Sequence, residues 1–132
     1  MYRLVYISTP KPDISRTDVE HILKAGRKNN AKNGITGLLI QDRRRFLQYL
    51  EGEAAQVEET FARIASDSRH SAVIQLKVGY IGRRQFPNWE MASKYIDDVD
   101  SLLPVVTDMV KNCDRDVAQE LMNFAEARDR AA

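Results

Sequence analysis

The sequence predicts a single α+β domain, a ferredoxin-like β-α-β-β-α-β arrangement with an added fifth strand and two C-terminal helices packed on the opposite sheet face. The length of 132 residues suits one domain. Apolar residues recur with strand and helix spacing in the order β-α-β-β-α-β-β and then in two further helical patterns. Four strands divided by two helices form a ferredoxin-like sandwich, which leaves one sheet face for the last two helices to cover. We expect residues 1–96 to form the core and residues 97–132 a helical cap.

The strands are indicated by short apolar runs between turn-forming residues. The run from Leu4 to Ile7 is nearly continuous, which is typical of a strand buried on both faces. We expect strands over residues 2–8, 35–40, 45–51, 73–81 and 89–96. Gly52 is expected to end the third strand, and the helix that follows it is expected to end near Ser68.

The first helix has recognisable start and stop signals. Ser15 is expected to cap it, with Asp18 as the partner in a capping box. Asn29 and Asn30 are expected to close the helix, and Gly34 to lie in its exit turn.

The last third of the chain holds two amphipathic patterns, the first over residues 102–110. Their apolar residues are expected to pack on the sheet: Leu102, Val106, Val117, Leu121 and Phe124. The joint that leads into them contains Asp97, Asp98 and Asp100, which favour exposure to solvent.

The composition excludes several classes of protein. Hydrophobic residues make up 43% of the chain and charged residues 30%, and the net charge is +1, so no overall field draws the protein to nucleic acid or to an anionic membrane. No apolar run approaches the roughly 20 residues that span a bilayer. With Cys113 as the single cysteine and no cluster of histidines and carboxylates at ligand spacing, we expect neither a disulfide nor a metal site. The chain starts directly in strand-like sequence, so we expect no signal peptide and a cytoplasmic location.

A buried polar pair is the most informative feature of the strands. Alternation places Gln48 between Phe46 and Leu50 on one face of the third strand. A buried carboxamide without a partner costs on the order of 1–3 kcal/mol, and Tyr6 on the first strand offers a hydroxyl. This pair is either an ordinary core hydrogen bond or part of a functional site.

The ends of the first two helices give two further clues. Gly26 falls on the apolar face of the first helix, where it would permit the close approach of a flat or bulky group. Asn29 and Asn30 either cap the helix or offer carboxamides to a heterocycle. Asp67, Ser68, Arg69 and His70 follow the second helix, where the basic residues either complement the helix dipole or bind a phosphate or ring carbonyl.

Four segments in order resemble the BLUF family of flavin-binding photoreceptors. The first strand is followed by Asn-Ala-Lys-Asn-Gly-Ile-Thr-Gly-Leu-Leu at residues 30–39, Phe-Leu-Gln-Tyr-Leu-Glu-Gly at 46–52, Asp-Ser-Arg-His at 67–70 and Arg-Gln-Phe-Pro-Asn-Trp-Glu-Met at 84–91. The resemblance covers about two thirds of the chain. It departs from the family's pattern at the hairpin of residues 42–45, where glycine is usual, and at Gly26, where alanine or serine is usual.

The resemblance implies a blue-light sensor that holds FAD noncovalently between its two main helices, with FMN or riboflavin able to fill the same site. Tyr6 would donate an electron and a proton, and Gln48 would switch its hydrogen bonds. Trp89 and Met91 would lie on the fifth strand and relay the change. Flavin-binding roles fall to Asn29, Asn30, Asp67, Arg69, His70, Ile22, Ile64 and Phe46.

The resemblance also implies how the signal is used. Short members of the family signal to a separate effector protein, which by analogy includes cyclic-dinucleotide enzymes, and they form homo-oligomers. We expect no catalytic activity, no nucleic-acid partner and no membrane partner. Two alternatives stay open at this point: a flavin-dependent redox enzyme and a cofactor-free ferredoxin-like binding module.

Overall fold

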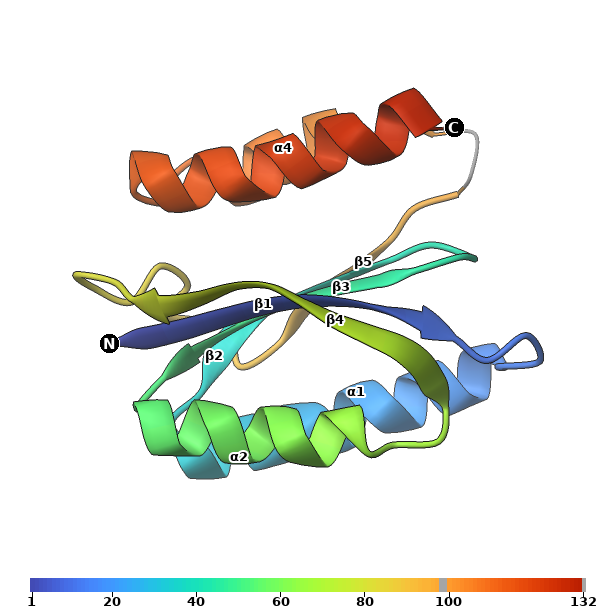
Figure 1. The fold of residues 1–132 in the computed structure, drawn as a ribbon, viewed down its shortest axis with the longest axis horizontal. Coiled ribbons are helices and arrows are strands. Elements are labelled where there is room, and N and C mark those ends of the chain that lie inside the picture. Colours follow the sequence, from blue (N-terminus) through green and yellow to red (C-terminus); the bar gives the residue numbers. More distant parts are fainter. Residues whose placement is uncertain (98–99, 132) are drawn as a thin grey trace.

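The chain folds into three layers, with a five-stranded sheet between two pairs of helices (Figure 1). This arrangement is seen in a computed structural model, which describes residues 1–97 and 100–131. The strands are β1 (Tyr2–Pro10), β2 (Thr36–Gln41), β3 (Phe46–Gly52), β4 (His70–Tyr80) and β5 (Ala92–Tyr95). The helices are α1 (Arg16–Asn33), α2 (Ala54–Ala65), α3 (Leu103–Met109) and α4 (Arg115–Ala131). The predicted fold class is confirmed.

The strand order is β4-β1-β3-β2-β5, and β3 lies at its centre. All neighbours run antiparallel except β2 and β5, which are parallel. We call the side covered by α1 and α2 the cavity face and the side covered by α3 and α4 the cap face. The alternation predicted for β3 is confirmed, because Phe46 and Leu50 pack on the cavity face while Leu47 and Tyr49 pack on the cap face.

The start and the exit turn of α1 follow the predicted signals. The Ser15 hydroxyl accepts a hydrogen bond from the Asp18 backbone N–H, and the Asp18 carboxylate accepts one from the Ser15 backbone, so the capping box is present. Gly34 follows the helix in the left-handed conformation at φ 68°, which glycine adopts without a Cβ clash. The helix runs on to Asn33, so Asn29 and Asn30 lie inside its last turns rather than closing it.

Two glycines of the β2–β3 region show how closely this part of the sheet is packed. A Cβ at Gly37 would lie 1.9 Å from the carbonyl oxygen of Tyr49, so only glycine fits at this point of β2. Gly52 is the last residue of β3 instead of a break after it.

Three other boundaries differ from the sequence prediction. The helix α2 ends at Ala65, so Asp67 and Arg69 lie in the loop that leads to β4. Strand β4 begins at His70 instead of residue 73, and as an edge strand it is largely exposed. Strand β5 begins only at Ala92.

The prediction that Trp89 and Met91 lie on the fifth strand is therefore wrong. Both belong to the loop before it, whose backbone is held by contacts other than a strand ladder. The Trp89 carbonyl accepts a hydrogen bond from the Gly37 N–H at 2.8 Å, and the Glu90 carbonyl accepts one from the Asn30 side chain at 2.6 Å.

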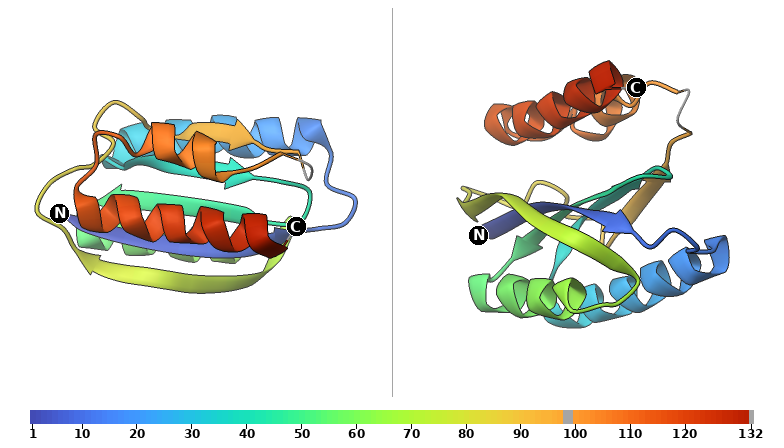
Figure 2. Two further views of the ribbon diagram at one scale, coloured as in Figure 1. Left: turned by 90° about the horizontal axis from the view of Figure 1, so that it is seen from above. Right: turned by 45° about the vertical axis from the view of Figure 1, so that its right-hand side comes forward.

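The two C-terminal helices cover the cap face, as predicted (Figure 2). The expected core residues lie there, with Phe124 partly buried: Leu102, Val106, Val117, Leu121 and Phe124. A partly buried ion pair of 2.6 Å between Arg3 of β1 and Glu120 fixes α4 on the sheet. Asp97 and Asp100 are exposed as expected, and Asp98 lies outside the described residues. Within the described part of the chain, no helix is long and apolar enough to cross a membrane.

Candidate functional site

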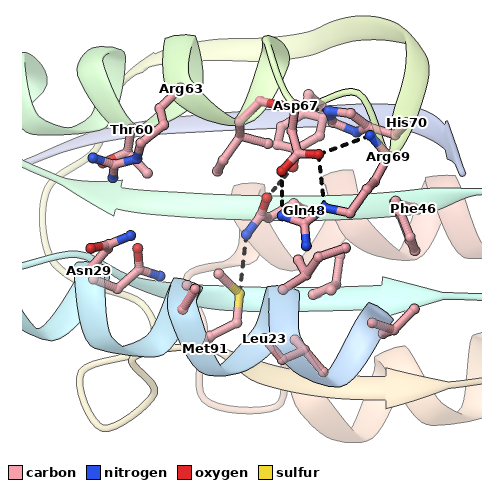
Figure 3. Close-up of a pocket in the computed structure, with 18 residues that line it drawn as sticks. Leu23, Asn29, Phe46, Gln48, Thr60, Arg63, Asp67, Arg69, His70 and Met91 are labelled. Atoms are coloured by element: carbon pink, nitrogen blue, oxygen red, sulfur yellow. Dashed lines mark hydrogen bonds and ion pairs between the residues drawn. The ribbon is translucent and has the colours of Figure 1, made fainter. Parts of the chain in front are cut away.

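A cavity of about 220 Å³ lies between α1, α2 and the sheet (Figure 3). Its lining includes all eight residues assigned to flavin binding by resemblance, together with Tyr6, Gln48 and Met91: Ile22, Asn29, Asn30, Phe46, Ile64, Asp67, Arg69 and His70. Trp89 is the one predicted site residue that does not line it. Segments far apart in the sequence therefore meet at one site.

The walls of the cavity are apolar and its edges are polar. Ile22 of α1 and Ile64 of α2 both line it, and Phe46 contributes a ring from β3. A Cβ placed on Gly26 would have Met91 Cε as its nearest neighbour, at 4.0 Å, so this glycine leaves room beside the cavity. Such a lining suits a flat heterocycle with apolar faces and hydrogen-bonding edges.

Tyr6 and Gln48 face each other at the base of the cavity. They are paired in the register of β1 with β3, and the Tyr6 hydroxyl donates a hydrogen bond to Gln48 Oε1. Gln48 Nε2 points to the Met91 sulfur at 3.2 Å. A thioether is a weak acceptor, so the amide nitrogen of Gln48 can turn to a stronger acceptor at little cost.

The surroundings of Tyr6 keep its hydroxyl protonated. The residue is 2% exposed and its ring lies 5.3 Å from that of Phe61. Burial raises the pKa of the Tyr6 hydroxyl above its ordinary value, and the negative charge of Asp67 raises it further. At neutral pH Tyr6 is therefore a hydrogen-bond donor.

Asn30 connects the first helix to the loop that carries Met91. It is 1% exposed, and its Nδ2 donates to the Glu90 carbonyl oxygen. Arg27, almost one turn earlier, donates from Nε to the Met91 carbonyl oxygen at 3.0 Å. Since both contacts hold the backbone around Met91, they also fix the sulfur that Gln48 meets.

The loop after α2 supplies a compact polar group. The Asp67 carboxylate accepts hydrogen bonds from Arg69, both from its backbone N–H and from its guanidinium, at 2.9 Å. These contacts lower the pKa of Asp67 to about 2. His70 Nε2 lies 2.6 Å from the carbonyl oxygen of Ile64 and must donate to it, and His70 Nδ1 lies 2.8 Å from the Ser8 hydroxyl.

Trp89 and Met91 point to opposite faces of the sheet. Met91 belongs to the cavity-face core, whereas Trp89 stacks on Phe86 with ring centroids 5.1 Å apart and packs against the cap-face core. This short segment thus contacts both the cavity and the layer under α3 and α4.

Glu51 anchors the loop between β4 and β5. This residue was not singled out from the sequence. Its carboxylate is fully buried on β3 and accepts hydrogen bonds from two hydroxyls and two backbone N–H groups: Thr36 Oγ1 (2.8 Å), Tyr49 Oη (3.1 Å), Gln85 N (2.8 Å) and Phe86 N (2.7 Å). The signal was present, because alternation places Glu51 on the same face as Leu47 and Tyr49.

Several cavity residues were also missed from the sequence: Val19, Leu23, Ala25, Leu39, Thr60 and Arg63. Thr60 stands one helical turn before Ile64, so the face of α2 that points inward could have been extended to it. Arg63 also lines the cavity, but it is a charged residue, so the apolar pattern of α2 does not indicate that it faces inward.

Comparison with known proteins assigns the chain to a family. A family model described as BLUF, sensors of blue-light using FAD, matches residues 1–92. The chain belongs to the BLUF family. BLUF proteins sense blue light with a flavin chromophore, and this chain carries a tyrosine and a glutamine at the corresponding site.

Individual relatives agree with this assignment. The chain is 33% identical over 91 residues to photoactivated adenylate cyclase subunit beta of Euglena gracilis, which covers 68% of this chain but only 11% of that relative. It is similar to the dark-state structure of the BLUF protein BlrB, at 27% identity and a TM-score of 0.73 over 96% of both chains. It is also similar to BlrP1 of Klebsiella pneumoniae in a complex with manganese and cyclic di-GMP, at 27% identity and a TM-score of 0.80 over 95% of this chain and 32% of that one.

The residues of this BLUF cavity fit a flavin. The isoalloxazine ring is flat, with apolar faces that match Ile22 and Ile64 and a polar edge that matches Asn30 and Gln48. Within the described part of the chain, the Met91 sulfur is the one acceptor that Gln48 Nε2 contacts, which leaves this donor available to a ring nitrogen or carbonyl. No group of three histidine, cysteine or acidic residues that could hold a metal ion is found among the residues that the structure describes.

Proposed function

We propose that this chain converts blue light into a rearrangement of hydrogen bonds between Tyr6 and Gln48 and passes the change to an effector protein. The observation that carries the proposal is the buried Tyr6–Gln48 pair at the base of a cavity that fits a flavin. When bound, the flavin supplies blue-light absorption and an excited state that accepts an electron.

The two residues have different tasks in this proposal. Tyr6 holds its proton on Oη and can give up an electron and that proton together, because its buried phenol is kept protonated. Gln48 offers a donor and an acceptor at opposite ends of one group. If the carboxamide of Gln48 rotates or tautomerises, the bonds offered to Tyr6, to Met91 and to the cavity change places.

We propose that the other cavity residues bind the flavin. Asn30 and Asn29 would hold the polar edge of the ring, Ile22 and Ile64 would flank its faces, and Phe46 would pack nearby. Support for Arg69 and His70 comes from their fixed positions at the cavity, since Asp67 orients Arg69 and two hydrogen bonds orient His70.

The output is proposed to leave through the loop of Trp89 and Met91. In support of this, the two side chains contact opposite faces of the sheet. We propose that residues 1–96 form the sensor core and residues 97–132 a cap whose packing responds to it, and that the chain forms homo-oligomers.

The effector is proposed to be a separate protein that makes or degrades a cyclic nucleotide or dinucleotide. Two comparisons support this class: the Euglena relative is named a photoactivated adenylate cyclase, and the BlrP1 complex contains cyclic di-GMP. Neither nucleic acid nor a membrane is proposed as a partner, and the cytoplasmic location stays a prediction from the sequence.

Absorption spectroscopy of the purified protein tests the proposal. We expect a yellow protein with a flavin spectrum that shifts reversibly to the red in blue light. Turnover of NAD(P)H with no light-induced shift would favour a flavin-dependent redox enzyme, and a protein that binds no flavin would favour a cofactor-free binding module.

A further inference from the structure

Strand β4 ends the sheet on one side, and its outer edge pairs with no strand among the residues that the structure describes. In the view from above in Figure 2, β4 is the outermost strand of the sheet. An edge strand presents a row of unpaired backbone N–H and C=O groups, which can pair with a strand of another chain. The outer edge of β4 is therefore a place where a further strand can join the sheet.

Large apolar side chains of β4 are exposed on both faces of the sheet. Val78 pairs with Leu4 of the cavity-face core, whereas Ile74 pairs with Ile7, which packs against the cap-face core. Directly paired residues point to the same side of a sheet, so Val78 and Ile74 lie on opposite faces. A helix laid on one face would cover only some of these groups, whereas a strand added at the edge has side chains above and below to cover both. The exposed apolar residues of β4 are Ile74, Leu76, Val78 and Tyr80.

The strand has few of the features that keep edge strands from pairing. It is 11 residues long, about twice the usual length of a strand, and it contains no proline. Register shifts with β1 bend it, but Lys77 is its one lysine, arginine or acidic residue, and Glu120 of α4 lies 4.0 Å from this charge. A charged partner strand would find no complementary charge here. A second β4 in antiparallel pairing meets no like charge, except in the single register that centres on Lys77.

We propose that the β4 strands of two copies of this chain pair antiparallel about a two-fold axis and join the two sheets into one. These observations favour a second copy as the partner, because its β4 brings an equally uncharged edge with apolar side chains above and below. Two-fold pairing is self-complementary, so each exposed side chain becomes covered in both copies. The inference rests on the proposed function only for the homo-oligomer, whose contact surface it names.

The size of this surface predicts a weak dimer. Tyr80 is 77% exposed, which leaves at least roughly 100 Å² of its side chain in solvent, and the other three apolar residues are about half exposed. Stable interfaces bury about 800 Å² on each partner, and one strand edge with four such side chains offers less. We therefore expect a dissociation constant in the micromolar range, about 1–100 μM.

Sedimentation velocity of the purified protein in darkness, at concentrations on both sides of this range, tests the surface. We expect the wild-type protein to change from monomer to dimer as its concentration rises. Leu76→Lys adds a positive charge to the edge in both copies and should raise the dissociation constant at least about tenfold. Tyr95→Lys is the matched control, because Tyr95 has the same exposed fraction of 46% and lies on β5 at the opposite edge of the sheet. This control should dimerise like the wild type.

Hydrogen exchange of the wild-type protein at low and at high concentration locates the contact without any variant. The amides of β4 should exchange more slowly at high concentration, because pairing covers the outer edge, while those of α3 and α4 should be unchanged. If Leu76→Lys does not fold, this measurement decides. Slower exchange on α3 and α4 with none on β4 would place the contact on another surface and overturn the proposal.

Three results of the sedimentation experiment would also overturn it: a monomer at every concentration, equal dimerisation of Leu76→Lys and the wild type, or equal weakening by Tyr95→Lys. A monomer whose absorption still shifts in blue light would refute the β4 contact and leave the light response intact. A dimer formed through β4 without any light-induced shift would support the contact and refute the proposed light response alone.

Discussion

Tyr6 and Gln48 are direct partners in the antiparallel pairing of β1 with β3, and the hydroxyl of one donates to the carboxamide oxygen of the other. Backbone pairing thus sets the spacing of the two side chains, while Met91 holds the far end of Gln48 through its sulfur. The strands stay fixed, and the carboxamide of Gln48 is the part of this chain of contacts that can change its partners most readily.

Replacing Tyr6 by phenylalanine should preserve flavin binding and abolish the productive light-induced shift. The ring still fills its buried place beside Phe61, and only the hydroxyl that donates to Gln48 is lost. Difference spectra before and during illumination measure the effect. Tyr80→Phe is a control at a tyrosine that is 77% exposed on β4 and should behave as wild type. A reversible shift of normal size in Tyr6→Phe would remove the role given to this residue.

Asn30→Ala should weaken flavin retention more than either Tyr6→Phe or Gln48→Leu. It removes a donor and an acceptor at the ring edge and also the hydrogen bond to the Glu90 carbonyl. A neutral hydrogen bond contributes about 0.5–1.5 kcal/mol, so we expect a loss of affinity of roughly twofold to tenfold for each one lost. Flavin occupancy after dialysis measures it, with Asn33→Ala at the end of the same helix as control. Full occupancy of Asn30→Ala would count against the assignment.

Glu51→Gln should destabilise the fold although it keeps the size of the side chain. The carboxylate accepts from two backbone N–H groups and two hydroxyls, and an amide nitrogen would place donor against donor. Leaving buried donors without an acceptor costs about 1–3 kcal/mol of the free energy of unfolding. Urea denaturation checks this against Glu53→Gln, an exposed neighbour. Equal midpoints for the two variants would show that the loop does not depend on this carboxylate.

Light should change hydrogen exchange more over residues 89–110 than in α1. The loop of Trp89 and Met91 contacts both sheet faces, and the end of α4 holds the joint that follows β5, where Arg128 donates to the Asp97 carbonyl oxygen at 3.0 Å. Exchange measured in darkness and under blue light tests this route. A larger change in α1 than in residues 89–110 would show that the signal leaves elsewhere. These contacts form a continuous path from the cavity to the cap face, along which a change at Met91 can spread.

The parts of the site that the sequence predicts are those set by local pattern. Alternation on β3 places Gln48 between Phe46 and Leu50 and predicts that its carboxamide needs a buried partner. Tyr6 on the first strand offers a hydroxyl for this, and the register of β1 with β3 confirms the pair. The capping box of Ser15 and Asp18 is equally local, because its partners are three residues apart.

The parts that the sequence does not predict depend on contacts between distant segments. The position of Met91 is fixed by hydrogen bonds from Asn30 and Arg27, which lie 60 or more residues earlier in the chain. The segment around Met91 is therefore a loop, although its sequence is typical of a strand. Arg63 lines the cavity only because of the way α2 docks on the sheet, and no pattern within the helix reveals that angle.

Absorption spectra of the wild-type protein and Gln48→Leu, recorded in darkness and under illumination, show whether Gln48 switches its hydrogen bonds under blue light. Leucine is similar in volume and suits the apolar surroundings, so a lost response would report lost hydrogen bonding and not a collapsed cavity. We expect both proteins to bind flavin, the wild type to show a reversible red shift, and Gln48→Leu to lack it. A reversible shift of the same size in Gln48→Leu would show that the hydrogen bonds of Gln48 are not the switch.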